Sequence, residues 1–439
     1  MGVVQMRAIG RVQAESNAGS LVFARSRLVG FFGDSRAFLS FSGSNGHDYL
    51  KGYGIAFWAQ KWANGCVTFP SSLNGGKAGE TTQDMLGRQA AYIATLKAAG
   101  ATMVVVIAGT NDRTGNKLTL GQSKTNIQRI VSNFQEAGIA VVLVSETPRG
   151  TGSSSYELTA AQASDLYQLH LWIERVMSRV CLVANVWDSW IDAASGALFR
   201  PLALMVMDGI HPSKIGGMWA GKAVAAKLML LSRRLPTLAH SSDVWSSSNP
   251  QGNLTANALV TGTSGAIAAS CNPTAGSVLA TGWNAEASNM AGVTTTWSKE
   301  MSAGEEWQRI DLAGTATAAA APELITYVDL NLAALADGDK IRATGLLGSR
   351  GTGLAAVGLA LMVVPGYSLK LDGEDSDNTQ PWPSQRLGPF PYESTALAFS
   401  ASAGLTLVRV RVQINLQAKA AVNARVWFSK TGALKVTYG

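Results

Sequence analysis

Three side chains of the kinds that cooperate in nucleophilic catalysis lie in two short segments far apart in the sequence. A Gly-Asp-Ser run ends at Ser35, directly after the apolar stretch 28–32, and an Asp-Gly-Ile-His run extends from Asp208 to His211. A serine hydroxyl needs a neutral imidazole to accept its proton, and a carboxylate must hold that imidazole in the correct tautomer. The spacing lets the Asp208 carboxylate reach one ring nitrogen of His211 while the other nitrogen faces Ser35. These residues therefore predict a nucleophilic serine.

Two further segments offer hydrogen-bond donors to a reaction intermediate. The apolar run 103–108 is typical of a buried parallel strand, and it delivers Asn111 to the same sheet edge. A glycine-rich stretch precedes a helical pattern, so that the Gly79 N–H lies near a helix start and is free to donate; the glycines at 75–76 compete for this role. Together with the Ser35 N–H, these groups make three donors for the oxyanion of a tetrahedral intermediate.

The elements that must position these groups alternate between apolar strands and helices. We expect strands at 28–32, 67–69, 103–108, 139–144 and 180–186, and helices at 81–99, 123–137, 158–179 and 213–231. Such alternation predicts a mostly parallel sheet between helical layers. Open sheets of this type bind ligands at the carboxyl ends of their strands, which is where the predicted strand before Ser35 ends.

The order of these motifs resembles that of the SGNH, or GDSL-type, hydrolase family. In chain order, the four blocks are Gly33-Asp34-Ser35, Gly79, Gly109-Thr110-Asn111-Asp112 and Asp208-Gly209-Ile210-His211-Pro212. The resemblance implies the flavodoxin-like α/β/α fold of that family. It implies Ser35 as the nucleophile, His211 as general base and acid, and Asp208 as the residue that orients His211. It also implies an oxyanion hole formed by Ser35, Gly79 and Asn111. The chain has only four histidines, and none lies at ligand spacing with another His, Cys or carboxylate pair, so that no metal or other cofactor is expected.

Two more residues are candidates for substrate binding. Arg36 follows Ser35 where a smaller or apolar residue is more usual in the family, and its side chain either binds an anionic substrate or points to solvent. Trp382 lies in a Pro-rich segment, where its ring either stacks on a sugar or packs in a core. Both alternatives stand for each residue.

Length and composition predict two domains, because 439 residues exceed what one core usually serves. Ser, Asn and Pro are enriched between the predicted hydrolase and the rest of the chain. We expect an N-terminal arm at 1–24, a catalytic domain at 25–235, a linker at 236–253 and an all-β sandwich or jelly roll at 254–439. The family resemblance covers the expected catalytic domain at 25–235 and nothing beyond it.

The clearest strand of the C-terminal domain is 408–416, whose apolar residues alternate with polar ones. This alternation predicts a half-exposed antiparallel strand. Its outward Arg409 and Arg411, with Arg425, either grip an acidic polysaccharide or form a solvated face. An appended β-sandwich is similar to the carbohydrate-binding modules of secreted polysaccharide esterases and to domains of phage tail proteins. Glycan binding or assembly is therefore its expected role.

Composition also excludes some classes of protein. No uninterrupted apolar run reaches the roughly 18 residues of a membrane-spanning helix, and no signal peptide is visible, so that no membrane insertion is expected. The net charge of +7 is spread without a dense Lys/Arg block, which argues against nucleic acid as a partner. We expect an extracellular or virion-associated protein that forms a homo-oligomer or joins a phage tail assembly.

The leading hypothesis is a serine esterase that removes O-acetyl groups from a polysaccharide. Two alternatives stay open: a lipid or aryl ester hydrolase with the same triad, and a glycan-binding virion or adhesion protein with a relic hydrolase domain. Because His211 must be neutral to act as a base, activity is expected to rise through about pH 6 to 7.

Overall fold

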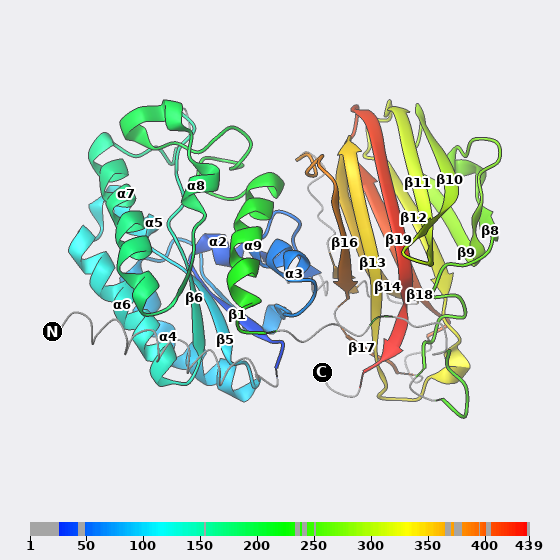
Figure 1. Cartoon of the computed structure of the whole chain (residues 1–439), viewed down its shortest axis with the longest axis horizontal. Coiled ribbons are helices and arrows are strands. Elements are labelled where there is room, and N and C mark those ends of the chain that lie inside the picture. Colours follow the sequence, from blue (N-terminus) through cyan, green and yellow to red (C-terminus); the bar gives the residue numbers. More distant parts are fainter. Residues whose placement is uncertain are drawn as a thin grey trace. The chain divides into compact units, whose positions relative to one another are not determined.

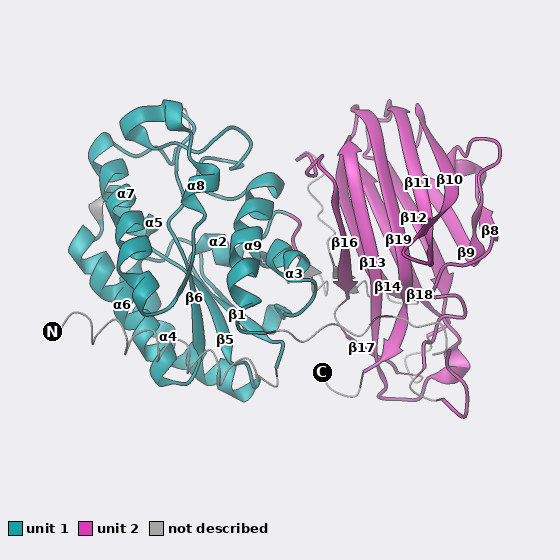
Figure 2. Cartoon of the chain, viewed as in Figure 1, with its two compact units in different colours: residues 1–41, 53–235 teal, residues 42–52, 236–439 magenta. Residues whose placement is uncertain are grey.

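The computed structural model divides the chain into two units (Figure 2). The described residues are 26–42, 49–152, 155–232, 238, 244–249, 252–364, 370–372, 380–394, 396–400 and 405–436. Unit 1 comprises Met1–Phe41 and Tyr53–Leu235, and unit 2 comprises Ser42–Gly52 and Pro236–Gly439. The structure thus differs from the expected domain limits at one place, because Ser42–Gly52 groups with unit 2. The expected arm at 1–24 lies outside the described residues, and the expected linker is described only in part.

Unit 1 is built on a five-stranded parallel sheet (Figure 1). Its strands are β1 (Val29–Gly33), β4 (Asn74–Gly76), β5 (Met103–Ile107), β6 (Ala140–Val144) and β7 (Leu182–Ala184). Their order is β4-β1-β5-β6-β7, and every neighbouring pair is parallel. The central strands are continuous apolar runs because helices cover both of their faces.

Five longer helices form the outer layers of unit 1. They are α3 (Ile55–Trp62), α4 (Thr82–Ala98), α6 (Leu120–Glu136), α7 (Ala160–Arg175) and α9 (Lys214–Leu228). Side chains of α4, α6 and α7, including Tyr92, Phe134 and Leu169, share one buried core with the strands. Helices α3 and α9 pack together on the opposite face, and α9 contacts β6 and β7 (Figure 1). The predicted three-layer α/β/α fold is confirmed.

Local sequence explains most of these boundaries. Thr81 and Thr119 each form a capping box at the start of a helix, and Ser213 caps α9. The prediction of a strand at 67–69 is wrong, because only Thr68 makes a bridge there and β4 occupies the edge of the sheet. The Asn-Gly-Gly sequence of β4 carries no apolar pattern by which it could be recognised. No helix in the described ranges is both long and apolar enough to cross a membrane.

Unit 2 is built on two six-stranded sheets (Figure 1), and it also contains the short strand β3 (Tyr49–Leu50), which lies outside both. Their strands are β8 (Ser264–Ile267), β9 (Leu279–Ser288), β10 (Val293–Ser302), β11 (Glu305–Thr315), β12 (Glu323–Asp329), β13 (Lys340–Thr352), β14 (Leu354–Val364), β15 (Lys370–Asp372), β16 (Leu387–Glu393), β17 (Leu397–Ala398), β18 (Leu407–Leu416) and β19 (Ala421–Lys435). One sheet has the order β10-β11-β19-β13-β16, with β17 beside β13, and the other has the order β15-β14-β18-β12-β9-β8. The described pairs are antiparallel except β8 with β9. Trp283 of one sheet contacts Phe428 of the other, with ring centroids 5.4 Å apart, as expected for a sandwich.

In strand β18, the prediction of a buried apolar face is confirmed, whereas the prediction of an open polar face is wrong. Its apolar residues are fully buried: Val408, Val410, Val412, Ile414 and Leu416. The opposite face is not a free row of cations, because Arg411 is buried and Arg409 pairs with Asp329 at 2.7 Å. Arg425 pairs with Asp311. The strand lies between β12 and β14 in its sheet, so that neighbouring side chains cover much of its polar face.

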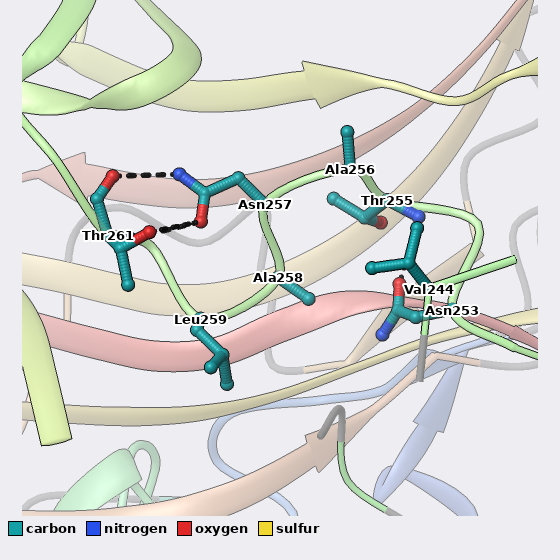
Figure 3. Close-up of a pocket in the computed structure, with 8 residues that line it drawn as sticks. All are labelled: Val244, Asn253, Thr255, Ala256, Asn257, Ala258, Leu259 and Thr261. Carbon is teal, nitrogen blue, oxygen red and sulfur yellow. Dashed lines mark hydrogen bonds between the residues drawn. The ribbon is translucent and has the colours of Figure 1, made fainter. Parts of the chain in front are cut away.

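A pocket of about 150 Å³ opens within unit 2 (Figure 3). It is lined by Val244, Asn253, Thr255, Ala256, Asn257, Ala258, Leu259 and Thr261. The side chains of Asn257 and Thr261 bond to each other at 3.0 Å (Figure 3), and the Asn257 amide also donates to the Thr281 carbonyl at 2.8 Å. These bonds occupy the side chains of Asn257 and Thr261, whereas Asn253 Nδ2 has no hydrogen-bond partner among the described residues.

Helix α9 packs closely on α3 because it carries glycine at the contact. A Cβ at Gly221 would overlap the Cβ of Trp58, and one at Gly217 would overlap the carbonyl oxygen of Tyr53. By contrast, nothing lies within 4 Å of a Cβ placed at Gly87 in α4. The two helices therefore offer a matched pair of glycines.

Gly221→Ala is expected to destabilise unit 1 by about 1–3 kcal/mol, since overpacking outweighs the gain of about 1 kcal/mol in helix propensity. Gly87→Ala is the control, and it should leave stability unchanged or raise it by up to about 1 kcal/mol. Thermal unfolding followed by circular dichroism measures both changes. Equal effects of the two substitutions would contradict the close packing of α3 on α9.

Candidate active site

The turn after β1 presents the Ser35 hydroxyl at the carboxyl edge of the sheet. Strand β1 ends at Gly33, and the short helix α2 (Ser35–Phe38) begins with Ser35. Asp34 caps this helix by accepting the Arg36 N–H at 2.9 Å. A side chain at Gly33 has no room, because its Cβ would lie 2.5 Å from the carbonyl oxygen of Ile107 in the neighbouring strand. The nucleophile candidate is thus fixed by a tight strand-to-helix turn.

The structure places His211 within hydrogen-bond distance of both other predicted triad residues, Ser35 and Asp208. His211 Nε2 lies 2.9 Å from Ser35 Oγ, and His211 Nδ1 lies 2.7 Å from Asp208 Oδ2. When Nδ1 carries the proton, the imidazole donates to Asp208 and accepts from the Ser35 hydroxyl. Asp208 also accepts the N–H groups of Ile210 and His211 at 3.1 and 3.0 Å, which shapes the loop that carries both residues.

The loop also keeps the Asp208 carboxylate ionised. Burial raises its pKa, but hydrogen bonds from the His211 ring and from the N–H groups of His211 and Ile210 outweigh that effect, so that the pKa of Asp208 is lowered to about 2. A carboxylate that stays charged can hold the imidazole and stabilise it when it takes up a proton. Tyr156 packs edge-on against the His211 ring, with centroids 5.9 Å apart.

Two of the predicted oxyanion donors, Gly79 and Asn111, lie in the segments that follow β4 and β5. Asn111 is in α5 (Thr110–Arg113), and its side-chain amide donates to the Glu80 carbonyl at 3.0 Å, which ties α5 to the loop that contains Gly79. Gly79 has a φ of +76° and open space around it. Within the described ranges, the N–H groups of Ser35 and Gly79 have no acceptor, so both are free to donate. Among the competing glycines, the Gly76 N–H already donates to the Asn74 side chain.

Arg36 neither binds substrate nor points to solvent, so both alternatives for this residue are wrong. Its side chain is buried against two carboxylates: Nη2 lies 2.7 Å from Asp34 Oδ2, and Nη1 lies 2.9 Å from Glu146 Oε2. Nη1 also donates to the Thr147 hydroxyl at 3.0 Å. Glu146 was missed by sequence reasoning. The only signal for it was an acidic residue just beyond the apolar strand at 139–144.

The electrostatics of this buried cluster depend on the pairing of its charges. Burial alone would lower the pKa of Arg36, but the charges and hydrogen bonds of Asp34 and Glu146 outweigh it and raise the pKa. The guanidinium therefore stays protonated. Without it, two carboxylates would be left buried with no counter-charge.

Trp382 is not an exposed platform for a sugar. Its side chain is buried in unit 2, and Nε1 donates to the Ser349 hydroxyl at 3.1 Å. The Pro-rich segment packs onto the sandwich, because its backbone also bonds to the neighbouring strand: the Trp382 N–H donates to the Leu354 carbonyl at 2.9 Å. The prediction of sugar stacking at this residue is wrong.

Residues 31–217 match the model of the GDSL-like Lipase/Acylhydrolase family. This part of the chain, somewhat less than half of it, is therefore similar to the GDSL-like lipase/acylhydrolase family. The match contains Ser35, Gly79, Asn111, Asp208 and His211.

Several solved structures resemble about half of the chain, at low identity. A GDSL-like lipase from Bacteroides thetaiotaomicron is 18% identical with a TM-score of 0.34, and the match covers 51% of this chain and 98% of that one. An acetyl-xylooligosaccharide esterase from Geobacillus is 16% identical with a TM-score of 0.34, over 49% of this chain and 99% of that one. The acetyl xylan esterase AlAXEase is 15% identical with a TM-score of 0.34, over 45% and 98%. Similarity at this level does not indicate a shared substrate. A comparison with curated proteins finds no match.

Arg36→Met is expected to lower the free energy of unfolding by about 3–5 kcal/mol, because it leaves Asp34 and Glu146 buried and unpaired. Arg200→Met is the control, since Arg200 pairs with Glu157 at 3.3 Å near the surface and should contribute about 1 kcal/mol or less. Urea unfolding of both variants and the parent chain measures the difference. A loss for Arg36→Met no larger than that for Arg200→Met would show that the cluster does not stabilise the fold.

Proposed function

We propose that unit 1 removes O-acetyl groups from a polysaccharide through an acyl-enzyme on Ser35. The observation that carries this proposal is the hydrogen-bonded series from Ser35 Oγ through both ring nitrogens of His211 to Asp208. An arrangement of this kind activates a hydroxyl for attack on an ester carbonyl. A relic domain would not be expected to keep three such residues from two distant segments in register.

In the first half of the reaction, the Ser35 oxygen attacks the acetyl carbonyl carbon while His211 Nε2 takes up the hydroxyl proton. The negative charge that develops on the carbonyl oxygen is stabilised by the N–H groups of Ser35 and Gly79 and by the Asn111 amide. As the tetrahedral intermediate collapses, the bond to the sugar oxygen breaks. The leaving sugar hydroxyl receives its proton from His211, and acetyl-Ser35 remains.

In the second half, a water molecule gives a proton to His211 Nε2 and attacks the acetyl carbonyl of the acyl-enzyme. The same donors stabilise the second tetrahedral intermediate. Its collapse returns the proton to Ser35 and releases acetic acid, which ionises to acetate. Asp208 holds the imidazole throughout and does not itself take up the proton.

The polysaccharide part of the proposal is supported by the domain organisation. A second unit of two antiparallel sheets accompanies the hydrolase on the same chain, and the triad does not include any of its residues. Such a unit suits a polymeric substrate or a particle to which the enzyme is attached, such as a phage tail. The proposed setting is accordingly extracellular or virion-associated, where acetylated glycans are accessible.

The proposal is tested by acetate release from a panel of acetylated polysaccharides, using the full chain. We expect release from at least one polymer, and a preference for aryl acetate over aryl octanoate. Ser35→Ala should lower kcat by about 10³-fold or more, whereas the exposed Ser178→Ala is the matched control and should keep the parent rate. Because the pKa of Asp208 is about 2, its carboxylate stays ionised around neutral pH, and its titration should not limit activity there.

Two results would overturn the proposal. Parent activity in Ser35→Ala would remove the acyl-enzyme mechanism. A preference for octanoate, with no acetate released from any polymer, would instead support a lipid ester hydrolase with the same triad.

A further inference from the structure

Arg149 lies at the active site but has no part in the reaction steps above. The next residue, Gly150, donates its N–H to the Gly209 carbonyl at 2.7 Å, so that this segment runs beside the loop of Asp208 and His211. The guanidinium carbon of Arg149 lies 5.8 Å from the centroid of the Tyr156 ring, which in turn packs edge-on against His211.

Hydrogen bonds to Thr110, Thr114 and Tyr156 fix the guanidinium near the predicted oxyanion donor Asn111. Nη1 donates to the carbonyl of Thr110, the residue before Asn111, at 3.1 Å, and to the Thr114 hydroxyl at 2.9 Å. Nε donates to the Tyr156 carbonyl at 2.7 Å. Arg149 is thus held between the helix that carries Asn111 and the ring that contacts His211.

Arg149 forms no direct ion pair with a carboxylate of the described residues. The side chain is 3% exposed, and the acceptors of its hydrogen bonds are carbonyl and hydroxyl oxygens. The two comparably buried arginines of unit 1, Arg36 and Arg113, each form an ion pair with a carboxylate. Burial, followed by the charge of Arg36, lowers the pKa of Arg149, and the more distant charges of Glu146 and Asp34 offset this only in part. Because a buried cation is stabilised by an anion, this position favours a negatively charged ligand group.

One terminal nitrogen of Arg149 is free to bind such a group. Nη2 makes no hydrogen bond to any described residue. It is not sealed from solvent, so that a ligand can reach it. The rest of the guanidinium is held by Thr110, Thr114 and Tyr156. A planar guanidinium fixed in this way is preorganised to donate to a carboxylate oxygen.

We propose that Arg149 is a specificity-determining residue that binds a carboxylate of the substrate, so that the preferred acetyl group is carried by a uronic acid. This inference rests on the proposed deacetylase function of the same site. Nη2 donates to the carboxylate while the acetyl group of the same sugar, or of its neighbour, reaches Ser35. A neutral sugar would leave the Arg149 charge without a partner and would bind more weakly.

The test compares two substrates that differ only in charge: an O-acetylated methyl glucuronoside and its uncharged uronamide. For the full chain, we expect kcat/KM to be about 10-fold or more higher for the acid, as is typical of a hydrogen bond between charged groups. Arg149→Gln should bring the ratio of the two values close to one. Arg129→Gln removes the same charge from an exposed position on α6 and should keep the parent ratio.

The inference is overturned if the parent chain shows equal kcat/KM values for the acid and the uronamide. It is also overturned if Arg149→Gln keeps the parent's preference for the acid. An equal fall in Arg129→Gln would assign the preference to general charge and would also overturn it. If both substrates are deacetylated equally well, the proposed function stands and only the role of Arg149 fails. If neither is deacetylated while an acetylated polymer releases acetate, the role of Arg149 fails and the proposed function stands; if no polymer releases acetate either, the proposed function itself fails.

Discussion

The carboxylates of Asp34 and Glu146 share one buried guanidinium, and the arrangement of the catalytic edge depends on this interaction. Asp34 stands at the end of β1 and caps the helix that begins with Ser35, while Glu146 stands just beyond β6. Arg36 therefore ties together two strand ends that are separated in the sheet by β5. An ion pair sealed from water is costly to break, so that the turn bearing the nucleophile candidate has little freedom to move.

Sheet topology explains why residues scattered along the chain meet at this turn. The order β4-β1-β5 places β1 between the strand that precedes Gly79 and the strand that precedes Asn111. The connection from β1 leads to β4 on one side of β1, and the connection from β4 crosses to β5 on its other side. Open α/β sheets bind ligands where the direction of the connections reverses in this way. The loop that carries Asp208 and His211 then needs to reach only one edge of the sheet. The same convergence brings Arg149 beside the site, because it follows β6 at that edge.

Much of unit 1 could be predicted because its signals are local. Apolar runs identified β1, β5 and β6, and capping residues such as Thr81 marked the helix starts. The residues of the triad were recognisable from their types, spacing and order. Strand β4 could not be found, since an Asn-Gly-Gly segment becomes a strand only through its pairing with β1.

The remaining errors concern contacts between distant segments. Arg36 pairs with Glu146, which lies 110 residues away, and no local pattern indicates that the two meet in the interior. The environment of Trp382 was mispredicted for the same reason. A Pro-rich sequence suggests exposure, whereas packing on the sandwich buries the ring. The polar face of β18 is covered by neighbouring strands, although a period of two predicts that it is open. In each case tertiary packing decides the environment of the side chain.

The most direct test of the account is covalent labelling of the full chain with a fluorophosphonate, followed by mass spectrometry of the intact protein and of its peptides. A serine activated by an imidazole reacts with such a probe, whereas an ordinary surface serine does not. The account predicts one adduct per chain, located on Ser35, and a labelling rate that falls by about 10³-fold or more in His211→Ala. An unlabelled Ser35, or equal labelling of the His211→Ala variant, would contradict it.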